Sequence, residues 1–387
     1  MLVWSLAIGL ADLKLSRFQI EWTAYSWIIL LIAILSFTIG VFVIYSVNSD
    51  KDVLEIEGIR EQFKGFQLDS QFLLRIIYIL FVLYILSYLI SYLIIGYFPL
   101  FSVRPSESRV GWGIFGFGLL NHMAPPILFF ITLYIVFIKG ELVNKVFLIV
   151  VALMTMATNL FLLHRFDLVL WLVVTSVFLF YTTDKMKFRN VIIILIFFIA
   201  LMYGVSALRL SRYVTNLLYY LAEMKFSVKY AFLTEPYMYI SMNLENFANA
   251  VDKLQTFDYG FNTFNFLLAL TGLQDMIFEY AAIKDFPHII TSNYNTYSSL
   301  FAYYKDFGVI GIGFIPFSLG MLIAGLHKKM RKEPNLTTIA VYGVFVFVMI
   351  FSFFVNALGW LHFIFNLSLF YFISRMIISR SNQKSAT

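Results

Sequence analysis

The stretch GVIGIGFIPFSLGMLIAGL (Gly308–Leu326) contains no charged residue. Such a run is long enough to cross the roughly 30 Å hydrocarbon layer of a bilayer as a single helix. Before it lie about one hundred polar and aromatic residues, Leu208–Phe307, between this run and the apolar runs of the amino-terminal half. The pattern predicts a membrane-spanning helix that follows a large loop outside the membrane.

The whole chain has the composition of a membrane protein. Of 387 residues, 61% are hydrophobic and 13% are charged, and a soluble protein with one core does not need so much apolar surface. We expect an all-α polytopic membrane protein with about ten transmembrane helices and one large, partly helical extracytoplasmic loop. The expected spans are Leu2–Leu10 (short, and open as a full span), Ala24–Val47, Phe72–Ile95, Phe115–Ile138, Val146–Leu163, Leu168–Tyr181, Val191–Leu208, Val309–Leu326, Thr338–Val355 and Leu358–Met376.

Basic residues are distributed unequally between the two sides that these spans define. With a cytoplasmic amino terminus, sixteen Lys and Arg residues fall in cytoplasmic segments and five in the short outer loops. Short cytoplasmic loops are enriched in Lys and Arg, so Leu208–Phe307 is expected to be extracytoplasmic. The net charge of +6 lies mostly in short loops and does not suggest nucleic acid, and the absence of Cys excludes disulfides and thiolate chemistry.

The chain therefore divides into four parts. Within the large loop, apolar residues at steps of three or four predict an amphipathic helix over Leu210–Val228, a second helix after Pro236, and a turn at Asp258–Asn265. The four parts are transmembrane helices 1–7 (1–207, with a cytoplasmic loop at 48–71 expected to be a solvated helix), the extracytoplasmic loop (208–307), three closing helices (308–376) and a cytoplasmic tail (377–387).

Three arginines are candidates for binding a diphosphate. Arg209 and Arg212 share a helix face where a span leaves the outer leaflet, and Arg165 lies in a short outer turn. Guanidinium groups bind phosphate oxygens with two bonds, which suits a lipid-linked diphosphate. The alternative for Arg209 and Arg212 is contact with phospholipid head groups.

Two residues compete as the general base. His288 in the large loop has a suitable side chain, and Asp306 lies at the mouth of the Gly308–Leu326 span. His122 and His362, with His164 near the same predicted outer face, are interpreted as buried hydrogen-bonding residues. The sequence has no metal-ligand spacing, so no metal and no cofactor are expected.

Tyrosines and glycines complete the set of candidate residues. The tyrosines of the large loop suit either an interfacial belt or stacking against sugars, and Tyr294, Asn295 and Tyr304 are the expected contacts to an acceptor sugar. The glycines are expected to permit close helix packing and not to form a phosphate-binding loop; they are Gly308, Gly311, Gly313 and Gly320.

NTYSSLFAYYKDFGVIGIGFIPFSLGMLIAGL (Asn295–Leu326) resembles the segment that closes the large outer loop of bacterial oligosaccharide repeat-unit polymerases, the Wzy-type O-antigen and capsule polymerases. SALRLSRY (Ser206–Tyr213) and Arg165 in LLHRFDLVLWL are also similar to that family. Related O-antigen ligases carry a His-Asn pair where this chain has Tyr294–Asn295, which speaks against a ligase.

The resemblance implies a glycosyltransferase of the C-type superfamily in the bacterial cytoplasmic (inner) membrane, with its active site facing the periplasm or exterior. It would transfer a glycan growing on undecaprenyl diphosphate to the non-reducing end of a new lipid-linked repeat unit. The implied partners are these lipid-linked oligosaccharides, membrane lipids, a chain-length regulator and a flippase. The alternatives are a ligase-like or other polyprenyl-sugar transferase and, in a different class, a flippase or transporter of the same pathway, although matching halves typical of transporters are not evident.

Overall fold

The computed structural model of the chain describes residues 2–47, 53–65, 68–102, 108–109, 112–114, 116–184, 186–190, 192–194, 196, 212–273, 276, 288–291, 294 and 296–386. Regular structure in this part is helical, and β pairing is limited to an isolated bridge between Ser16 and Met224. The all-α class expected from the sequence is confirmed for the described residues.

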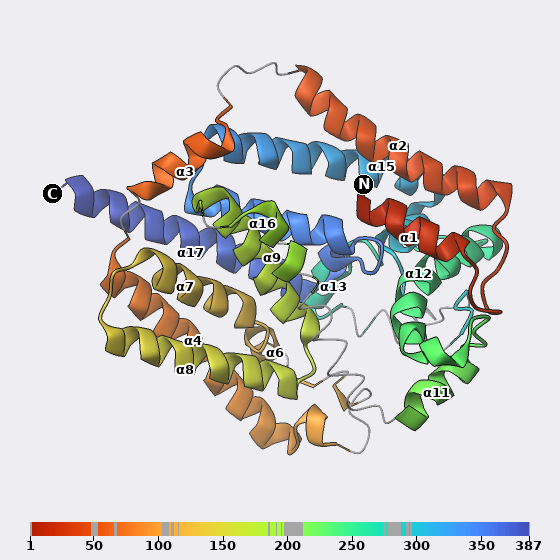
Figure 1. The fold of residues 1–387 in the computed structure, drawn as a ribbon, viewed down its shortest axis with the longest axis horizontal. Helices are drawn as coiled ribbons and strands as arrows, with labels where there is room; N and C mark the ends of the chain where they lie inside the picture. The colour runs from red at the N-terminus through yellow and green to blue at the C-terminus, as the bar shows by residue number, and fades with distance from the viewer. Residues whose placement is uncertain are drawn as a thin grey trace. The chain divides into compact units, whose positions relative to one another are not determined.

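Seven of the described helices are long and apolar enough to cross a membrane, so the chain is a membrane-embedded protein (Figure 1). Two further apolar helices, α1 (Leu2–Asp12) and α16 (Leu336–Phe351), are shorter, and the span expected at Val191–Leu208 lies largely outside the described residues. A total of about ten spans therefore stays a prediction. The seven long helices are α2 (Ala24–Val47), α4 (Ser70–Ile95), α6 with α7 (Phe117–Leu120 and Ala124–Phe137), α8 (Leu142–Phe161), α9 (Arg165–Thr182), α15 (Ser299–Lys332) and α17 (Leu361–Ala386).

The remaining described helices are short or carry polar residues on one face. They are α3 (Ile56–Lys64), η1 (Pro99–Phe101), α11 (Arg212–Leu221), η2 (Val228–Leu233), α12 (Thr234–Lys253), α13 (Asn265–Thr271) and η4 (Ala357–Gly359).

The chain folds into two compact units, each built from segments that are distant in the sequence. Unit 1 comprises Met1–Asp50, Ile199–Gly325 and Val348–Leu361; unit 2 comprises Lys51–Phe198, Leu326–Phe347 and His362–Thr387.

In unit 1, α2 and α15 cross at two glycines. A Cβ atom on Gly40 would lie 2.1 Å from the carbonyl oxygen of Phe317, and one on Gly320 would lie 2.3 Å from that of Phe37. The two backbones thus approach too closely for any side chain at either position. Close helix packing, expected for Gly320, is confirmed, whereas Gly313 has no such neighbour among the described residues.

The helix α15 begins at Ser299, before the expected start of the span, and contains a break at Gly308. Gly308 has φ 58° and ψ −141°, a backbone conformation that favours glycine. A Cβ there would also lie 2.8 Å from the ring of Phe257. The expected start of the span at Gly308 therefore corresponds to a kink between two helical parts and not to the start of a helix.

The polar helix α12 is largely buried in unit 1, where it packs against α1 and α2 (Figure 1). Its Glu245 is fully buried and accepts hydrogen bonds from Lys14 Nζ (2.7 Å) and Trp22 Nε1 (2.9 Å). Gln19 Nε2 and the backbone N–H of Ile20 donate to the same carboxylate at 3.2 Å each. The side chains of α12 thus hold the link between α1 and α2, because a buried carboxylate requires such donors.

Two of the expected helices differ from the structure. The amphipathic helix expected to reach Val228 ends at Leu221, because Glu223 adopts φ 47° and Met224 pairs with Ser16. The helix in the 48–71 loop forms as α3, but it is not fully solvated. Its Ile59 and Phe63 are buried in unit 2, where α3 packs against α9, since these two residues share one face of the helix.

Candidate functional site

Three histidines and one aspartate of unit 2 lie together at one end of its helices. His122 lies just before α7, and His164 is the N-cap residue of α9. His362 is the second residue of α17, and Asp167 lies in the first turn of α9. Three helix amino termini therefore adjoin this cluster, which we call the histidine cluster.

The rings of the histidine cluster are stacked. The imidazole of His122 lies 4.2 Å, centroid to centroid, from those of both His164 and His362, with interplanar angles of 9° and 17°. Two rings cannot stack on the same face of the His122 ring. The His122 ring therefore lies between the rings of His164 and His362. Its Nδ1 is 2.8 Å from Oδ2 of Asp167, which fixes the orientation of the ring.

Asp167 is the buried acid of the cluster. Its side chain is 5% exposed, and its Oδ2 also accepts a hydrogen bond from Asn159 Nδ2 at 3.4 Å. A carboxylate in the first turn of a helix is stabilised by the unpaired N–H groups there. The chain reaches this position through a tight link between α8 and α9, in which Leu163 adopts φ 61°.

His164 is held in its neutral form. Burial, together with the adjacent His122, lowers the pKa of His164 from its ordinary value of 6.5 to about 3, and Asp167 opposes the change. Within the described part of the chain, its buried Nδ1 has no hydrogen-bond partner. A neutral imidazole with an unprotonated nitrogen can accept a hydrogen bond or bind a metal ion.

The arrangement supports two kinds of chemistry. An aspartate that accepts a hydrogen bond from an imidazole raises the basicity of the ring and orients it, as in proton-transfer sites and metal sites. His122, Asp167 and His362 each also offer one ligand atom, and these three atoms lie within 4.8 Å of one another. The interpretation of His122 and His362 as buried hydrogen-bonding residues agrees with the contact between His122 and Asp167 but did not include this convergence.

The sequence does contain one sign of the cluster. His122, His164 and His362 are each predicted at the same end of a span, on the outer side, and the structure brings the three together. The residues come from separate helices, however, so no local spacing marks them as a group.

Of the two base candidates, Asp306 is buried in unit 1 and fully engaged. Its Oδ2 accepts from the backbone N–H of Thr263 at 2.6 Å, and its Oδ1 accepts from the N–H and Nδ2 of Asn262 at 3.0 and 2.8 Å. The adjacent Lys305 pairs with Asp258 at 2.9 Å. Asp306 thus holds the predicted turn at Asp258–Asn265, whose presence is confirmed by its backbone.

The other base candidate, His288, is half-buried in unit 1. Its carbonyl oxygen accepts from Asn249 Nδ2 of α12 at 2.8 Å, which ties the segment before Tyr294 to the buried helix. Burial lowers the pKa of His288, and the positive charges of Lys253 and Lys305 lower it further. The imidazole is therefore neutral near pH 7, as a general base requires.

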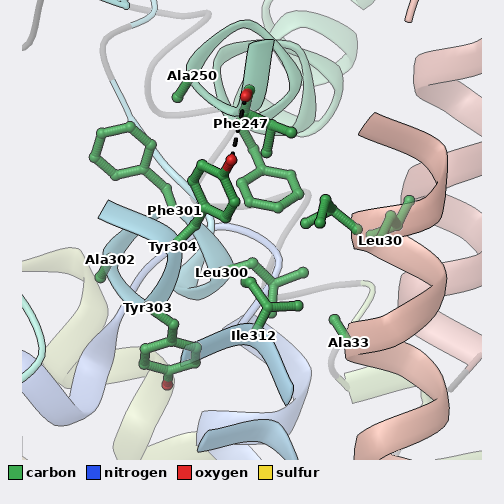
Figure 2. Packing of buried hydrophobic residues seen from close by; sticks show 12 residues of the cluster. Leu30, Ala33, Phe247, Ala250, Leu300, Phe301, Ala302, Tyr303, Tyr304 and Ile312 are labelled. Carbon is green, nitrogen blue, oxygen red and sulfur yellow. Dashed lines mark hydrogen bonds between the residues drawn. The ribbon is translucent and has the colours of Figure 1, made fainter. Parts of the chain in front are cut away.

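The two tyrosine candidates are buried in unit 1. Tyr304 packs against Phe247 and donates to the carbonyl of Val251 at 3.3 Å (Figure 2). Tyr294 packs against Tyr239, and its buried hydroxyl has no hydrogen-bond partner among the described residues. The Tyr294 hydroxyl thus remains the more suitable of the two for a polar ligand.

The structure describes the three candidate arginines to different extents. Arg165 is the first residue of α9 and lies in the same turn as His164 and Asp167, partly buried. Arg209 and Asn295 lie outside the described residues, and of Arg212 only the backbone, at the start of α11, is described. Convergence of the three arginines on a diphosphate therefore stays a prediction.

No family model, no curated protein and no solved structure matches this chain in comparisons with known proteins.

Proposed function

We propose that this chain is a membrane glycosyltransferase that polymerises oligosaccharide repeat units linked to undecaprenyl diphosphate on the outer face of the cytoplasmic membrane. The observation that carries the proposal is the helical segment α11–α13, which precedes the long apolar helix α15 and whose α12 packs against α1 and α2 in unit 1. A folded helical segment beside membrane-spanning helices suits an enzyme whose substrates are polar glycans on lipid anchors. The resemblance of Asn295–Leu326 to Wzy-type polymerases supports the same assignment.

The proposed reaction forms one glycosidic bond and breaks one bond to phosphate. A hydroxyl oxygen of the acceptor sugar attacks the anomeric carbon of the donor glycan, and the bond from that carbon to the diphosphate breaks. The diphosphate leaves on its lipid, and the hydroxyl proton passes to a base or to water. Because a diphosphate is already a good leaving group, the protein has to neutralise its charge and orient the hydroxyl.

The residues proposed for these tasks are the candidates that the sequence indicates. Arg165, Arg209 and Arg212 would bind the diphosphate, and His288 or Asp306 would accept the proton. Tyr294, Asn295 and Tyr304 would contact the acceptor. The hydroxyl of Tyr304 already donates to Val251 and the carboxylate of Asp306 is engaged, which favours Tyr294 and His288 within this set.

The proposal is tested by identifying the glycan that accumulates when the gene is deleted. Loss of a polymerase should leave single repeat units on undecaprenyl diphosphate at the outer face, without polymer, and expression of the chain should restore a ladder of lengths. Mass spectrometry of extracted lipid-linked glycans distinguishes the alternatives. Full-length polymer retained on the lipid carrier would indicate a ligase, and single units that remain on the cytoplasmic face would indicate a flippase.

A further inference from the structure

We propose that His122, Asp167 and His362 form a binding site for a divalent transition-metal ion, with Zn²⁺ as the best-suited ion. The proposal goes beyond the glycosyltransferase reaction and does not depend on it. All three residues belong to unit 2 and lie at the helix amino termini of the histidine cluster.

The distances allow one ion to reach all three residues. Three ligand atoms that lie within 4.8 Å of one another fit within about 2.8 Å of a common point, the radius of the circle through an equilateral triangle of that side. Zn²⁺ binds nitrogen and oxygen at about 2.0–2.2 Å. Each ligand atom would have to move inward by less than about 1 Å, and the two stacked imidazoles would also have to rotate so that their ring planes point at the ion.

The distance between His122 and Asp167 is already close to the distance between two ligand atoms on one Zn²⁺. Nδ1 of His122 and Oδ2 of Asp167 lie 2.8 Å apart and share a proton. Two ligand atoms on a tetrahedral Zn²⁺ are separated by about 3.3 Å, as follows from bonds of about 2.0–2.1 Å. A cation that replaces the shared proton would need to widen this contact only slightly.

His164 lies beside these three residues, on the opposite face of the His122 ring from His362. Its Nδ1 is 3.8 Å from Oδ2 of Asp167 and, within the described part of the chain, has no hydrogen-bond partner. Leaving a buried polar atom without a partner costs free energy, so a positive charge held beside it at Asp167 would interact favourably with this nitrogen when it is unprotonated. Two histidines and one aspartate match the three protein ligands of open Zn²⁺ sites, in which water or substrate takes the fourth position.

The types of ligand select the class of ion. Imidazole nitrogen favours Zn²⁺, Co²⁺, Ni²⁺ and Cu²⁺, whereas Mg²⁺ and Ca²⁺ favour sites made of oxygen. A metal–nitrogen bond lies in the plane of the imidazole, so the near-parallel rings of His122 and His362 must tilt away from their 17° angle when both bind one ion. Metal binding should therefore disrupt the ring stacking.

The experiment uses the full-length chain in detergent, purified with a tag that contains no histidine. The protein is stripped with EDTA, loaded with ZnCl₂ and separated from free ion by gel filtration, and the bound Zn²⁺ is measured by mass spectrometry. Variants His122→Ala and His362→Ala test the site. His327→Ala is the matched control, because His327 belongs to unit 2 and contacts Tyr181 and Tyr342, away from the cluster residues.

We expect one Zn²⁺ per chain in the wild type and in His327→Ala, and at least about tenfold less bound Zn²⁺ in both cluster variants. Equal Zn²⁺ content in all four proteins, or substoichiometric Zn²⁺ in the wild type, would overturn the proposal. A second measurement requires no variant and covers the case in which a variant does not fold. The wild-type chain loaded with Co²⁺ should absorb visible light as tetrahedral Co²⁺ does, and Zn²⁺ should abolish the signal. The absence of such absorption would also refute the site.

Discussion

Lys14 Nζ lies 2.7 Å from Oε1 of Glu245, and the two side chains are 14% and 0% exposed. Lys14 adopts φ 48° in the link between α1 and α2, and Glu245 lies in the middle of α12. This ion pair, which also places the Lys14 ammonium 4.8 Å from the Trp22 ring centroid, joins the amino-terminal helices to the buried helix of unit 1. Burial raises the pKa of Glu245, and the contacts with Lys14 oppose that change.

Removal of Lys14 should destabilise unit 1 strongly. Lys14→Ala leaves a buried carboxylate without its cation, and breaking such a pair costs about 3 kcal/mol or more. The lower melting temperature is measured in detergent, with the exposed Lys229→Ala as control. Lys14→Met combined with Glu245→Gln removes both charges and should be more stable than Lys14→Ala. If Lys14→Ala melts like the control, the ion pair does not hold the fold.

The crossing of α2 and α15 predicts a difference between two glycines of the same helix. Gly320→Ala places a Cβ 2.3 Å from the carbonyl oxygen of Phe37, so the helices must separate, at a cost of about 1–3 kcal/mol. Gly313→Ala meets no described atom within 4 Å and should be neutral or slightly stabilising, because alanine favours helix. Thermal melting of both variants tests the crossing, and equal melting temperatures would contradict it.

Local patterns predicted the helices well but not the polar contacts between them. The bounds Ala24–Val47 are the same in the sequence prediction and in α2, because a continuous apolar run of that length has one favourable conformation in a bilayer. The burial of Glu245 and the cluster of His122, His164 and His362 could not be predicted. Their partners are far apart in the sequence, and periodicity reports only on neighbours within one helix.

The break in α15 is a further example. The glycines of Gly308–Leu326 were expected to serve helix packing, and Gly320 does. Gly308 instead takes a positive φ beside the ring of Phe257. A run of glycines and apolar residues does not reveal which glycine bends the chain, because the bend is decided by the side chain that packs against it.

The extracytoplasmic position of Leu208–Phe307 can be tested by cysteine labelling, since the chain has no native Cys. Gln255→Cys lies at an exposed position after α12, and Glu333→Cys lies at an exposed position after α15. A membrane-impermeant maleimide should label Gln255→Cys in intact cells and Glu333→Cys only after the membrane is permeabilised. The reverse labelling pattern would mean that the topology is inverted. Leu208–Phe307 would then lie on the cytoplasmic side, where the proposed reaction does not take place.

Arginine variants test the proposed diphosphate site. Loss of one charge-assisted hydrogen bond costs roughly 1.5–3 kcal/mol, which corresponds to about one to two decades in rate. Arg165→Ala and Arg209→Ala should therefore slow polymerisation by about tenfold to one hundredfold. Lysine at these positions should restore little activity, because it lacks the planar fork of arginine.

The matched control for these variants is Arg17→Ala, an exposed arginine that is also predicted on the outer side. Its rate should remain at the wild-type level. If Arg165→Ala and Arg209→Ala polymerise as fast as this control while they are expressed normally, the two arginines are membrane anchors, and the diphosphate must bind elsewhere.

The last prediction concerns the proton acceptor. A histidine base must be neutral, so activity should fall as the pH decreases through the pKa of His288. Burial together with Lys253 and Lys305 lowers that pKa, so the acid limb of the rate profile should lie below the ordinary histidine value of about 6.5. His288→Ala should lower the rate and flatten the limb. Lys253→Ala removes a nearby positive charge and should move the limb to higher pH.

Asp306→Asn tests the competing base, but its effect on the fold must be measured as well. The Asp306 carboxylate accepts two backbone N–H groups, from Asn262 and Thr263, and an asparagine offers only one oxygen to these two donors. Asp306→Asn should therefore lower the melting temperature whatever its role in catalysis. If His288→Ala keeps its rate and pH profile while Asp306→Asn is folded and inactive, the base is Asp306. If both variants remain active, neither side chain is required, and charge stabilisation and positioning drive the reaction.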